Sequence, residues 1–125
     1  MKKIIEGAGK LGIKLNSRQV KQFELYYQAL IEWNKKINLT AITDYSSVQV
    51  KHFLDSLTVT LALSKEEMER PDFSIVDVGT GAGFPGVPLK ILFPQPRLVL
   101  IEPTTKKTAF LTTLSANWSW KMSKC

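Results

Sequence analysis

The sequence predicts an α/β fold in which helices come first and a β-α-β-α unit with parallel strands follows. Apolar residues recur at three- and four-residue steps before residue 64, and two short apolar runs then appear at Phe73–Val78 and Leu98–Ile101, each followed by a helical pattern. A strand, a helix and a second strand in this order form a right-handed crossover with parallel strands. We therefore expect an N-terminal helical region, residues 1–68, and a sheet region, residues 69–125.

The composition is that of a globular protein in water. The chain has 125 residues, of which 44% are hydrophobic and 22% are charged. Its one cysteine, Cys125, cannot form an internal disulfide bond, which favours a cytoplasmic location. No apolar run reaches the roughly 20 residues of a membrane span, and Glu6 and Gly7 interrupt the N-terminus before a signal segment develops. We expect neither export nor membrane insertion.

The net charge of +6 is distributed unevenly. Residues 1–43 carry five more basic than acidic residues, residues 44–105 carry three more acidic than basic ones, and residues 106–125 carry four lysines and no acid. A basic N-terminal region suits a polyanionic partner that approaches from one side. A solvated, lysine-rich face explains the charge equally well.

The N-terminal region is expected to contain three helices. Residues 2–13 give a weak helical pattern with three glycines. Asn16 and Gln19 form a capping box that starts a second helix, which reaches about Lys36. Its predicted core stripe comprises Val20, Phe23, Tyr27, Leu30, Ile31 and Ile37. After an extended segment at residues 38–43, Ser46 and Gln49 suggest a second capping box and a third helix to about Leu63, whose predicted core stripe comprises Val50, Phe53, Leu54, Leu57 and Leu61.

His52, Asp55 and Ser56 share one face of the third helix by their spacing. A hydrolase triad is excluded, because a nucleophilic serine needs an oxyanion hole and the amides of a regular helix bond to one another. A surface cluster is the simpler interpretation.

A charged connector, residues 64–72, leads to the strand Phe73–Val78 and then to a glycine-rich loop. Pro85 and Pro88 fit the first turn of a short helix at residues 86–92, where their missing N–H groups are not needed. The strand Leu98–Ile101 follows and ends at Glu102. Thr104 or Thr105 then caps a last helix, with Ala109, Phe110, Leu111 and Leu114 on its inner side.

The glycine loop and Glu102 together predict a site for a cofactor that contains a nucleoside. Glycines let the backbone approach a ligand closely, and a helix N-terminus beyond them supplies N–H groups. Glu102 follows Gly79 by 23 residues and ends the neighbouring strand, where a carboxylate can accept hydrogen bonds from both ribose hydroxyls. A nucleoside triphosphate loop is excluded because no Gly-Lys-Ser/Thr follows the glycines.

The glycines alone leave the cofactor open, since Gly81-x-Gly83-x-x-Gly86 also fits the dinucleotide fingerprint of an NAD-binding oxidoreductase. Three details argue against NAD. The strand ends two residues too early, Asp77 places a negative charge near the pyrophosphate position, and Phe84 replaces a small residue beside the phosphate. A sulfonium cofactor has no phosphate, and Asp77 would favour its positive charge.

Several segments resemble one known family. Residues 76–89, with the sequence Val-Asp-Val-Gly-Thr-Gly-Ala-Gly-Phe-Pro-Gly-Val-Pro-Leu, resemble motif I of the ribosomal small-subunit methyltransferase G family, also called glucose-inhibited division protein B. Residues 38–42 and 51–57 resemble the same family, as do Lys106 and Lys107 with Phe110 and Leu111. The resemblance covers about residues 15–116.

The resemblance implies a class I S-adenosylmethionine-dependent methyltransferase with a Rossmann-like sheet, which methylates N7 of a guanine in the 16S ribosomal RNA of the small subunit. It implies that the cofactor lies against Asp77, Gly79, Gly81, Gly83, Phe84 and Glu102, where Glu102 replaces the usual Asp. It also implies that Asn38, His52, Asp55, Lys106 and Lys107 line the guanine pocket or contact RNA. N7 already carries a lone pair, so we expect no catalytic residue, and we expect no metal.

The chain also departs from the family. The family's sheet has seven strands, of which this chain is expected to supply only the first two, and the resemblance stops at Ala116. Residues 117–125 can be encoded AAT TGG AGT TGG AAA ATG TCA AAG TGC, which in a shifted frame reads Leu-Glu-Leu-Glu-Asn-Val-Lys-Val, the family's continuation. We therefore expect that a frameshift near Asn117 truncated the chain; a short paralogue is the alternative.

An incomplete sheet has physical consequences. A strand edge and one sheet face should remain uncovered, so the chain alone is expected to bind S-adenosylmethionine weakly or not at all. The second class of function is a non-enzymatic RNA-binding or interaction module built on the basic N-terminal helices.

Overall fold

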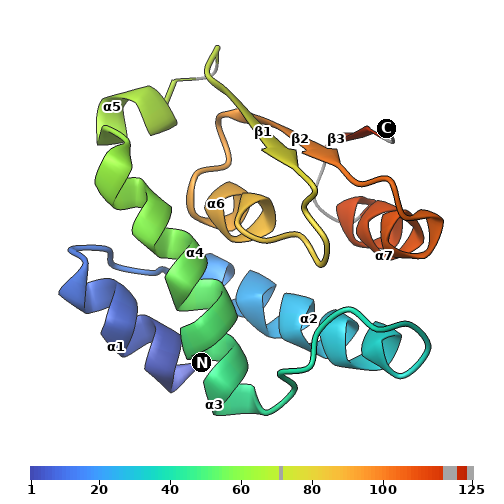
Figure 1. Cartoon of the computed structure of the whole chain (residues 1–125). Coiled ribbons are helices and arrows are strands. Elements are labelled where there is room, and N and C mark those ends of the chain that lie inside the picture. Colours follow the sequence, from blue (N-terminus) through green and yellow to red (C-terminus); the bar gives the residue numbers. More distant parts are fainter. Residues whose placement is uncertain (71, 117–120, 124–125) are drawn as a thin grey trace.

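The computed structural model describes residues 1–70, 72–116 and 121–123 of the chain. The N-terminal part contains α1 (Lys2–Lys10), α2 (Ser17–Asn34), a helical segment over residues 45–62 and α5 (Lys65–Met68). The second part contains β1 (Ser74–Val78), α6 (Gly86–Leu92), β2 (Arg97–Ile101), α7 (Thr105–Ser115) and β3 (Lys121–Ser123). The predicted α/β class and the order of helices before strands are confirmed (Figure 1).

Local capping signals explain where the helices begin. The capping box at Asn16 is present, because its side chain accepts a hydrogen bond from the Gln19 N–H (2.8 Å) and its own N–H donates to Gln19 Oε1 (2.9 Å). The second predicted box, at Ser46, is wrong. The N-cap lies two residues earlier, at Asp44, whose side chain accepts a hydrogen bond from the Ser47 N–H (2.9 Å).

The segment over residues 45–62 changes its helical type three times. It runs through α3 (Tyr45–Ser47), the π-helix η1 (Val48–Leu54), α4 (Asp55–Leu57) and the 3-10 helix η2 (Thr58–Ala62). The predicted apolar stripe is therefore wrong at both ends, since Val50 is 43% exposed and Leu61 is 71% exposed. The prediction assumed a constant α-helical period. The wider turns of the π-helix and the narrower turns of the 3-10 helix instead rotate these two residues away from the core.

The sheet is parallel, with the strand order β1-β2-β3. In its register Val76 pairs with Val99 and Val78 pairs with Ile101. The strand β3 pairs with β2 through Val99 and Lys121. Two strands were expected, and the described sheet has a third, short strand, β3. Its three residues lie in the tail that has no apolar period, and pairing with a neighbouring strand stabilises extended backbone that periodicity cannot reveal.

All described helices leave one face of the sheet uncovered. In Figure 1, α6 and α7 lie on one side of the strands, with α2 and α1 beyond α6. On the other side, the side chains of Val76 and Val78 are 56% and 75% exposed. The predicted uncovered edge and face are present in the described part of the chain.

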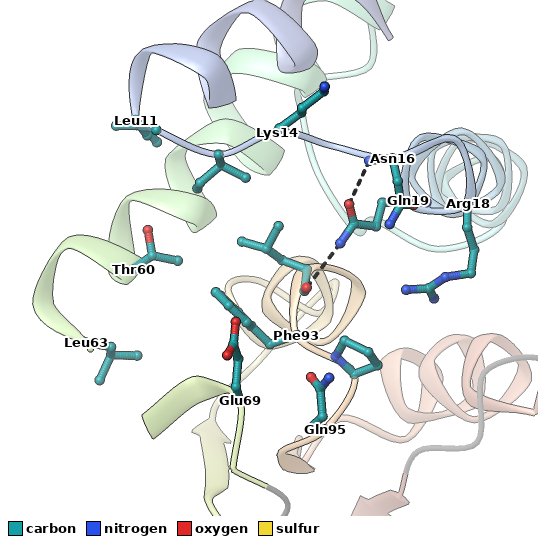
Figure 2. A pocket seen from close by; sticks show the side chains of 14 residues that line it. Leu11, Lys14, Asn16, Arg18, Gln19, Thr60, Leu63, Glu69, Phe93 and Gln95 are labelled. Atoms are coloured by element: carbon teal, nitrogen blue, oxygen red, sulfur yellow. Dashed lines mark hydrogen bonds between the residues drawn. The ribbon is translucent and has the colours of Figure 1, made fainter. Parts of the chain in front are cut away.

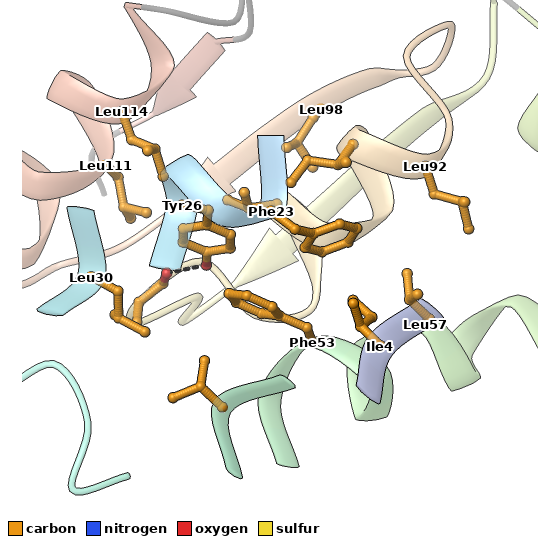
Figure 3. Close-up of a cluster of buried hydrophobic side chains, with 14 of the residues drawn as sticks. Ile4, Phe23, Tyr26, Leu30, Phe53, Leu57, Leu92, Leu98, Leu111 and Leu114 are labelled. Carbon is orange, nitrogen blue, oxygen red and sulfur yellow. Dashed lines mark hydrogen bonds between the residues drawn. The ribbon is translucent and has the colours of Figure 1, made fainter. Parts of the chain in front are cut away.

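One hydrophobic core joins the two parts (Figure 3). Phe23 and Tyr26 of α2 are fully buried beside Phe53 of η1, with ring centroids 5.1 Å from Phe53 in both cases. The sheet side adds Leu100 and Leu111 to the same cluster. The predicted core residues Phe23 and Leu30 are fully buried. Tyr26, which was not predicted, is fully buried with them, whereas the predicted Tyr27 is only partly buried at the edge of the cluster. The division at residues 68 and 69 stays a prediction.

Candidate functional site

The glycine loop follows β1 at the carboxyl end of the sheet. Gly79 and Gly81 have φ angles of +68° and +61°, which side chains rarely tolerate. A Cβ atom at either residue would have no neighbouring heavy atom within 4 Å, so the backbone here borders open space. The N–H groups of Gly79 and Thr80 both donate to the Ile101 carbonyl oxygen, at 2.8 and 3.2 Å. This part of the loop is tied to β2 and is open to a ligand.

Gly83 has a different environment, although it belongs to the same motif. Its φ is +99°, and a Cβ atom would lie 2.6 Å from Val87 Cγ2 and 2.8 Å from the Tyr26 hydroxyl oxygen. The residue is buried. Close packing against α6 and α2 therefore requires a glycine at this position, and its contact with a cofactor stays a prediction.

Asp77 turns its carboxylate toward the inside of the loop. Its Oδ2 accepts hydrogen bonds from the Thr80 hydroxyl (2.7 Å) and from the Gly86 N–H (3.0 Å). Burial raises the pKa of Asp77 above its ordinary value, and these two hydrogen bonds oppose the shift only in part. Asp77 thus holds the loop closed against the start of α6. A direct contact with the cofactor stays a prediction.

Glu102 lies under the open part of the loop. One carboxylate oxygen accepts from the Gly81 N–H and the other from the Thr104 N–H, both at 2.9 Å. Burial raises the pKa of Glu102, but the hydrogen bonds from Thr104 and Gly81 and the charge of Lys107 together bring it below its ordinary value. The side chain is therefore an ionised acceptor beside Gly81. The Thr104 hydroxyl is a third donor to the carboxylate, and the residue is only 4% exposed. A carboxylate has about four lone-pair sites, so it can accept one more hydrogen bond from a ligand hydroxyl that reaches it beside Gly81.

Phe84 and His52, predicted on different grounds, are in direct contact. Their rings are stacked with centroids 4.5 Å apart and an interplanar angle of 14°. His52 Nε2 and the Thr40 hydroxyl form a hydrogen bond of 2.7 Å. Asn34 Oδ1 in turn accepts from the N–H groups of Leu39 and Thr40, at 2.9 and 3.0 Å. A chain of contacts thus connects the segment at residues 38–42 to the glycine loop.

Three residues of this arrangement were missed by the sequence analysis. They are Tyr26, whose hydroxyl donates to the Ala82 carbonyl oxygen (2.5 Å), and the hydrogen-bonding residues Asn34 and Thr40. Thr40 lies in a segment that had been singled out, but nothing in its spacing pointed to His52. For Tyr26, the position three residues after Phe23 was a signal for burial and not for contact with the loop.

The remaining predicted residues are spread around the loop. Lys107 influences Glu102 electrostatically, and Asp55 does the same for His52. Asn38 and Lys106 are exposed, and the structure does not bring either to the glycines. Ser56 donates its hydroxyl to the His52 carbonyl oxygen (2.7 Å), which agrees with the exclusion of a hydrolase triad. Contact of these residues with RNA stays a prediction.

Replacing His52 with phenylalanine is expected to remove a pH-dependent part of the stability. Burial lowers the pKa of His52 below its ordinary value of 6.5, and the charge of Asp55 opposes this only in part. The unfolded chain therefore binds the proton more readily, so the wild type loses stability as the pH falls through 6.5 toward the lower, folded-state pKa. His52 is the one histidine of the chain, which makes the assignment direct.

The measurement is urea unfolding of both proteins from about pH 5 to pH 7.5. Phenylalanine keeps the stacking on Phe84, and any titration of Asp77 cancels in the difference. The free energy of unfolding of the wild type, relative to that of His52→Phe, should decrease as the pH is lowered. A difference that does not change with pH would contradict the prediction.

The structure also has a cavity of about 480 Å³, away from the loop. It lies between the α1–α2 connection, η2 and the α6–β2 connection (Figure 2). Lys14, Arg18 and Glu69 are among its polar lining, and Gln19 Nε2 donates to the Leu92 carbonyl oxygen (3.1 Å) at its wall. None of the predicted site residues lines it.

The described ranges contain neither a cluster of metal ligands nor a membrane-spanning helix. No group of three or more His, Cys, Asp or Glu side chains there is arranged to hold a metal ion. In the same ranges, no helix has the length and apolar character needed to cross a membrane.

Comparison with known proteins gives consistent matches. The model of the family described as rRNA small subunit methyltransferase G matches residues 19–123. The ribosomal RNA small subunit methyltransferase G of Dehalococcoides mccartyi is 53% identical over 115 residues, which are 92% of this chain and 47% of that protein. The proteins of the same name from Caldanaerobacter subterraneus and Bacillus thuringiensis are both 48% identical, over 90% and 83% of this chain and 45% and 42% of their own lengths.

The chain thus spans less than half the length of the curated relatives that it matches. The family match runs past Ala116 to residue 123, so the expected end of the resemblance at Ala116 is wrong. The frameshift near Asn117 stays a prediction, and residue 117 lies outside the described residues. The match covers most of the chain and includes the glycine loop, Glu102 and the strand β3. The chain therefore belongs to the rRNA small subunit methyltransferase G family.

Proposed function

We propose that the chain carries the S-adenosylmethionine-binding loop of a methyltransferase that acts on N7 of a guanine in 16S ribosomal RNA, in the cytoplasm. The observation that carries this proposal is the open backbone at Gly79 and Gly81 directly beside the ionised acceptor Glu102. The family match supports methyl transfer to ribosomal RNA. The identity of the methyl donor, of the methylated base and of the ring nitrogen goes beyond the family match and is part of the proposal.

The loop suits a cofactor without phosphate better than a dinucleotide. In the dinucleotide fingerprint the N–H groups at the helix N-terminus bind pyrophosphate. Here the Gly86 N–H donates to Asp77 (3.0 Å), and the Val87 N–H donates to the Gly83 carbonyl oxygen (2.7 Å). Pro85 and Pro88 have no N–H to offer. The N–H groups at the start of α6 therefore already have hydrogen-bond partners within the protein, which argues against the NAD-binding alternative.

The residues around the loop fit the proposed ligand in distinct ways. The ionised carboxylate of Glu102 can accept a further hydrogen bond from a ribose hydroxyl. Gly79 and Gly81 allow the ligand to lie against bare backbone, and Phe84 presents an aromatic ring that His52 supports. When bound, S-adenosylmethionine supplies an activated methyl group on a sulfonium sulfur. Because N7 of guanine has a lone pair, these residues have to bind and orient the reactants and need not remove a proton.

The Gly81→Arg variant is expected to lose S-adenosylmethionine binding at least about tenfold, because its side chain occupies the open space beside Glu102. The measurement is a titration followed by ¹⁵N NMR, which detects weak binding and locates it by residue. The amides of Gly79 and Gly81 should shift in the wild type.

Gly12→Arg is the matched control, because Gly12, just after α1, also has a positive φ (+79°) and a Cβ atom there would have no neighbouring heavy atom within 4 Å. It should bind like the wild type. Shifts confined to another region, or unchanged binding by Gly81→Arg, would overturn the proposed site.

The 125 residues alone are expected to transfer no methyl groups and to bind the cofactor weakly. The backbone at Gly79 and Gly81 borders open space, and the relatives contain a second half that has no counterpart in these residues. Transfer of tritiated methyl groups to small-subunit RNA should be seen only with a frame-restored, longer chain. Micromolar binding of S-adenosylmethionine by the monomeric 125-residue chain in calorimetry would contradict this.

The second candidate function is a non-enzymatic RNA-binding module, and it is favoured by the excess of basic residues over residues 1–43. The same variant separates the two. An enzyme remnant loses cofactor binding in Gly81→Arg and keeps RNA binding, whereas a pure binding module shows no cofactor binding to lose.

A further inference from the structure

The cavity of about 480 Å³ lies at the opposite end of the sheet from the glycine loop. Phe93, Pro94 and Gln95 form part of its wall and come just before β2, at the amino end of the parallel strands. The glycine loop follows β1, at the carboxyl end of the same strands. Ligands of open α/β sheets that serve the main reaction bind at the carboxyl end. A ligand in this cavity would therefore occupy a second site, separate from the proposed cofactor.

Hydrogen bonds fix two walls of the cavity and join them. In the α1–α2 connection the Ile13 N–H donates to a carbonyl oxygen in the last turn of α1 (2.9 Å). Gln19 is 7% exposed, and its Nε2 donates to the Leu92 carbonyl oxygen (3.1 Å), which ties α2 to the end of α6. Lys90 Nζ donates to the Pro94 carbonyl oxygen (2.7 Å) in the α6–β2 connection. The cavity is thus preformed, and its volume is in the range of small-molecule sites.

Part of the lining is apolar and only partly buried. Leu11, Ile13 and Phe93 pack at the edge of the core, and Leu63, at the end of η2, is also partly buried. Each of these side chains keeps apolar surface that borders the cavity. Removing such surface from water favours binding, so this part of the lining suits a ligand with an apolar body.

The polar part of the lining has an excess of positive charge, since Lys14 and Arg18 stand against one carboxylate, Glu69. Over the described ranges neither cation forms an ion pair, and Arg18 donates only to Gln22 Oε1, at 3.3 Å. Figure 2 shows Arg18 on one side of the cavity and Glu69 with Leu63 on the other. A guanidinium group can donate two parallel hydrogen bonds to a carboxylate or a phosphate, so the Arg18 side suits an anionic group.

We propose that this cavity binds a small organic anion, whose carboxylate or phosphate group pairs with Arg18 beside Lys14 and whose apolar body covers Phe93 and Leu63. The proposal rests on the cavity and depends neither on the cofactor nor on the reaction. An inorganic anion uses only the charged part of the lining, and a neutral apolar molecule uses only the other part. Both should therefore bind more weakly than a molecule that combines the two.

The test is a titration of the 125-residue chain followed by ¹⁵N NMR, with 4-phenylbutyrate and phenyl phosphate as probes. At least one of them should bind saturably with a Kd below about 1 mM, and the tighter of the two identifies the preferred anionic group. The amides of Ile13, Phe93 and Gln95 should shift, and those of Gly79 and Gly81 should not. Acetate, inorganic phosphate and the neutral 4-phenylbutyramide should each bind at least fivefold more weakly than the tighter probe.

Arg18→Gln removes the proposed partner of the anionic group and is expected to weaken binding at least about fivefold. The change takes a positive charge from the first turn of α2, so it should not destabilise the helix. Lys21→Gln is the matched control, because Lys21 is exposed on the same helix and does not line the cavity, and it should bind like the wild type. Leu63→Trp places a large ring in the cavity and should abolish binding. Circular dichroism checks that each variant remains folded.

Three results would overturn the proposal. The first is the absence of saturable shifts at the cavity amides with both organic anions. The second is equally tight binding of acetate, inorganic phosphate or the neutral amide, which would indicate an adventitious ion only or a purely apolar contact. The third is an equal effect of Arg18→Gln and Lys21→Gln, or unchanged binding by a folded Leu63→Trp, because binding would then not depend on this cavity.

Discussion

The Gly83→Ala variant should unfold with a free energy about 2–5 kcal/mol lower than that of the wild type. The φ of +99° makes any side chain at this residue strained, and the added Cβ would lie 2.6 Å from Val87 Cγ2, 2.8 Å from the Tyr26 hydroxyl oxygen and 3.2 Å from Leu111 Cδ2. All three neighbours belong to the packed core, so they have little room to move. Urea unfolding followed by circular dichroism measures the difference.

Gly81→Ala is the matched control, because it shares the positive φ and lacks the close neighbours. It should cost only the conformational strain of about 1–2 kcal/mol. The gap between the two variants therefore isolates close packing from backbone conformation. Equal losses at both residues would show that packing against Val87 and Tyr26 is not what restricts Gly83.

Phe53→Ala is the second change with a large expected effect, about 3–5 kcal/mol. The ring is fully buried, and its centroid lies 5.1 Å from those of Phe23 and Tyr26 and 6.0 Å from that of Phe84. Removing it leaves a cavity between α2, η1 and the loop. Urea unfolding gives the loss of stability, and hydrogen exchange at the Gly83 amide shows whether the loop opens with it.

Phe93→Ala provides the comparison for an aromatic residue at the edge of the core, since Phe93 is only partly buried. Its loss should be about 1–2 kcal/mol, because less apolar surface leaves the interior. A loss at Phe53 no larger than that at Phe93 would mean that the core relaxes to fill the space. The loop should exchange like the wild type in Phe93→Ala.

Elements whose signals are local were predicted well. The helix at residues 86–92 and the capping box at Asn16 follow from residues within a few positions, and the structure has both. The segment over residues 45–62 failed because its changes of helical type depend on what it packs against. Gln49 illustrates this, since it accepts from the Ile4 N–H (3.2 Å) in α1 and does not complete a capping box.

The candidate site shows the same division between local and distant information. The glycines and Glu102 were found from their positions after two strands, and the structure joins Gly81 to Glu102. The stacking of His52 on Phe84 links residues that are 32 positions apart, and no spacing rule predicts such a pair. For Asp77 the sequence predicted a negative charge near the loop but not the orientation of the carboxylate, which depends on hydrogen bonds from the Thr80 hydroxyl and the Gly86 N–H.

The hydrogen bond from the Tyr26 hydroxyl to Ala82 and the His52 ring on Phe84 have a thermodynamic consequence for any ligand of the loop. They fix the loop's shape while the helices dock, so the entropy of ordering it is lost during folding and not again on binding. Affinity is then coupled to global stability, because only the folded fraction is preorganised. Core variants far from the loop should weaken binding in proportion to the folded population they remove, without altering one contact to the ligand.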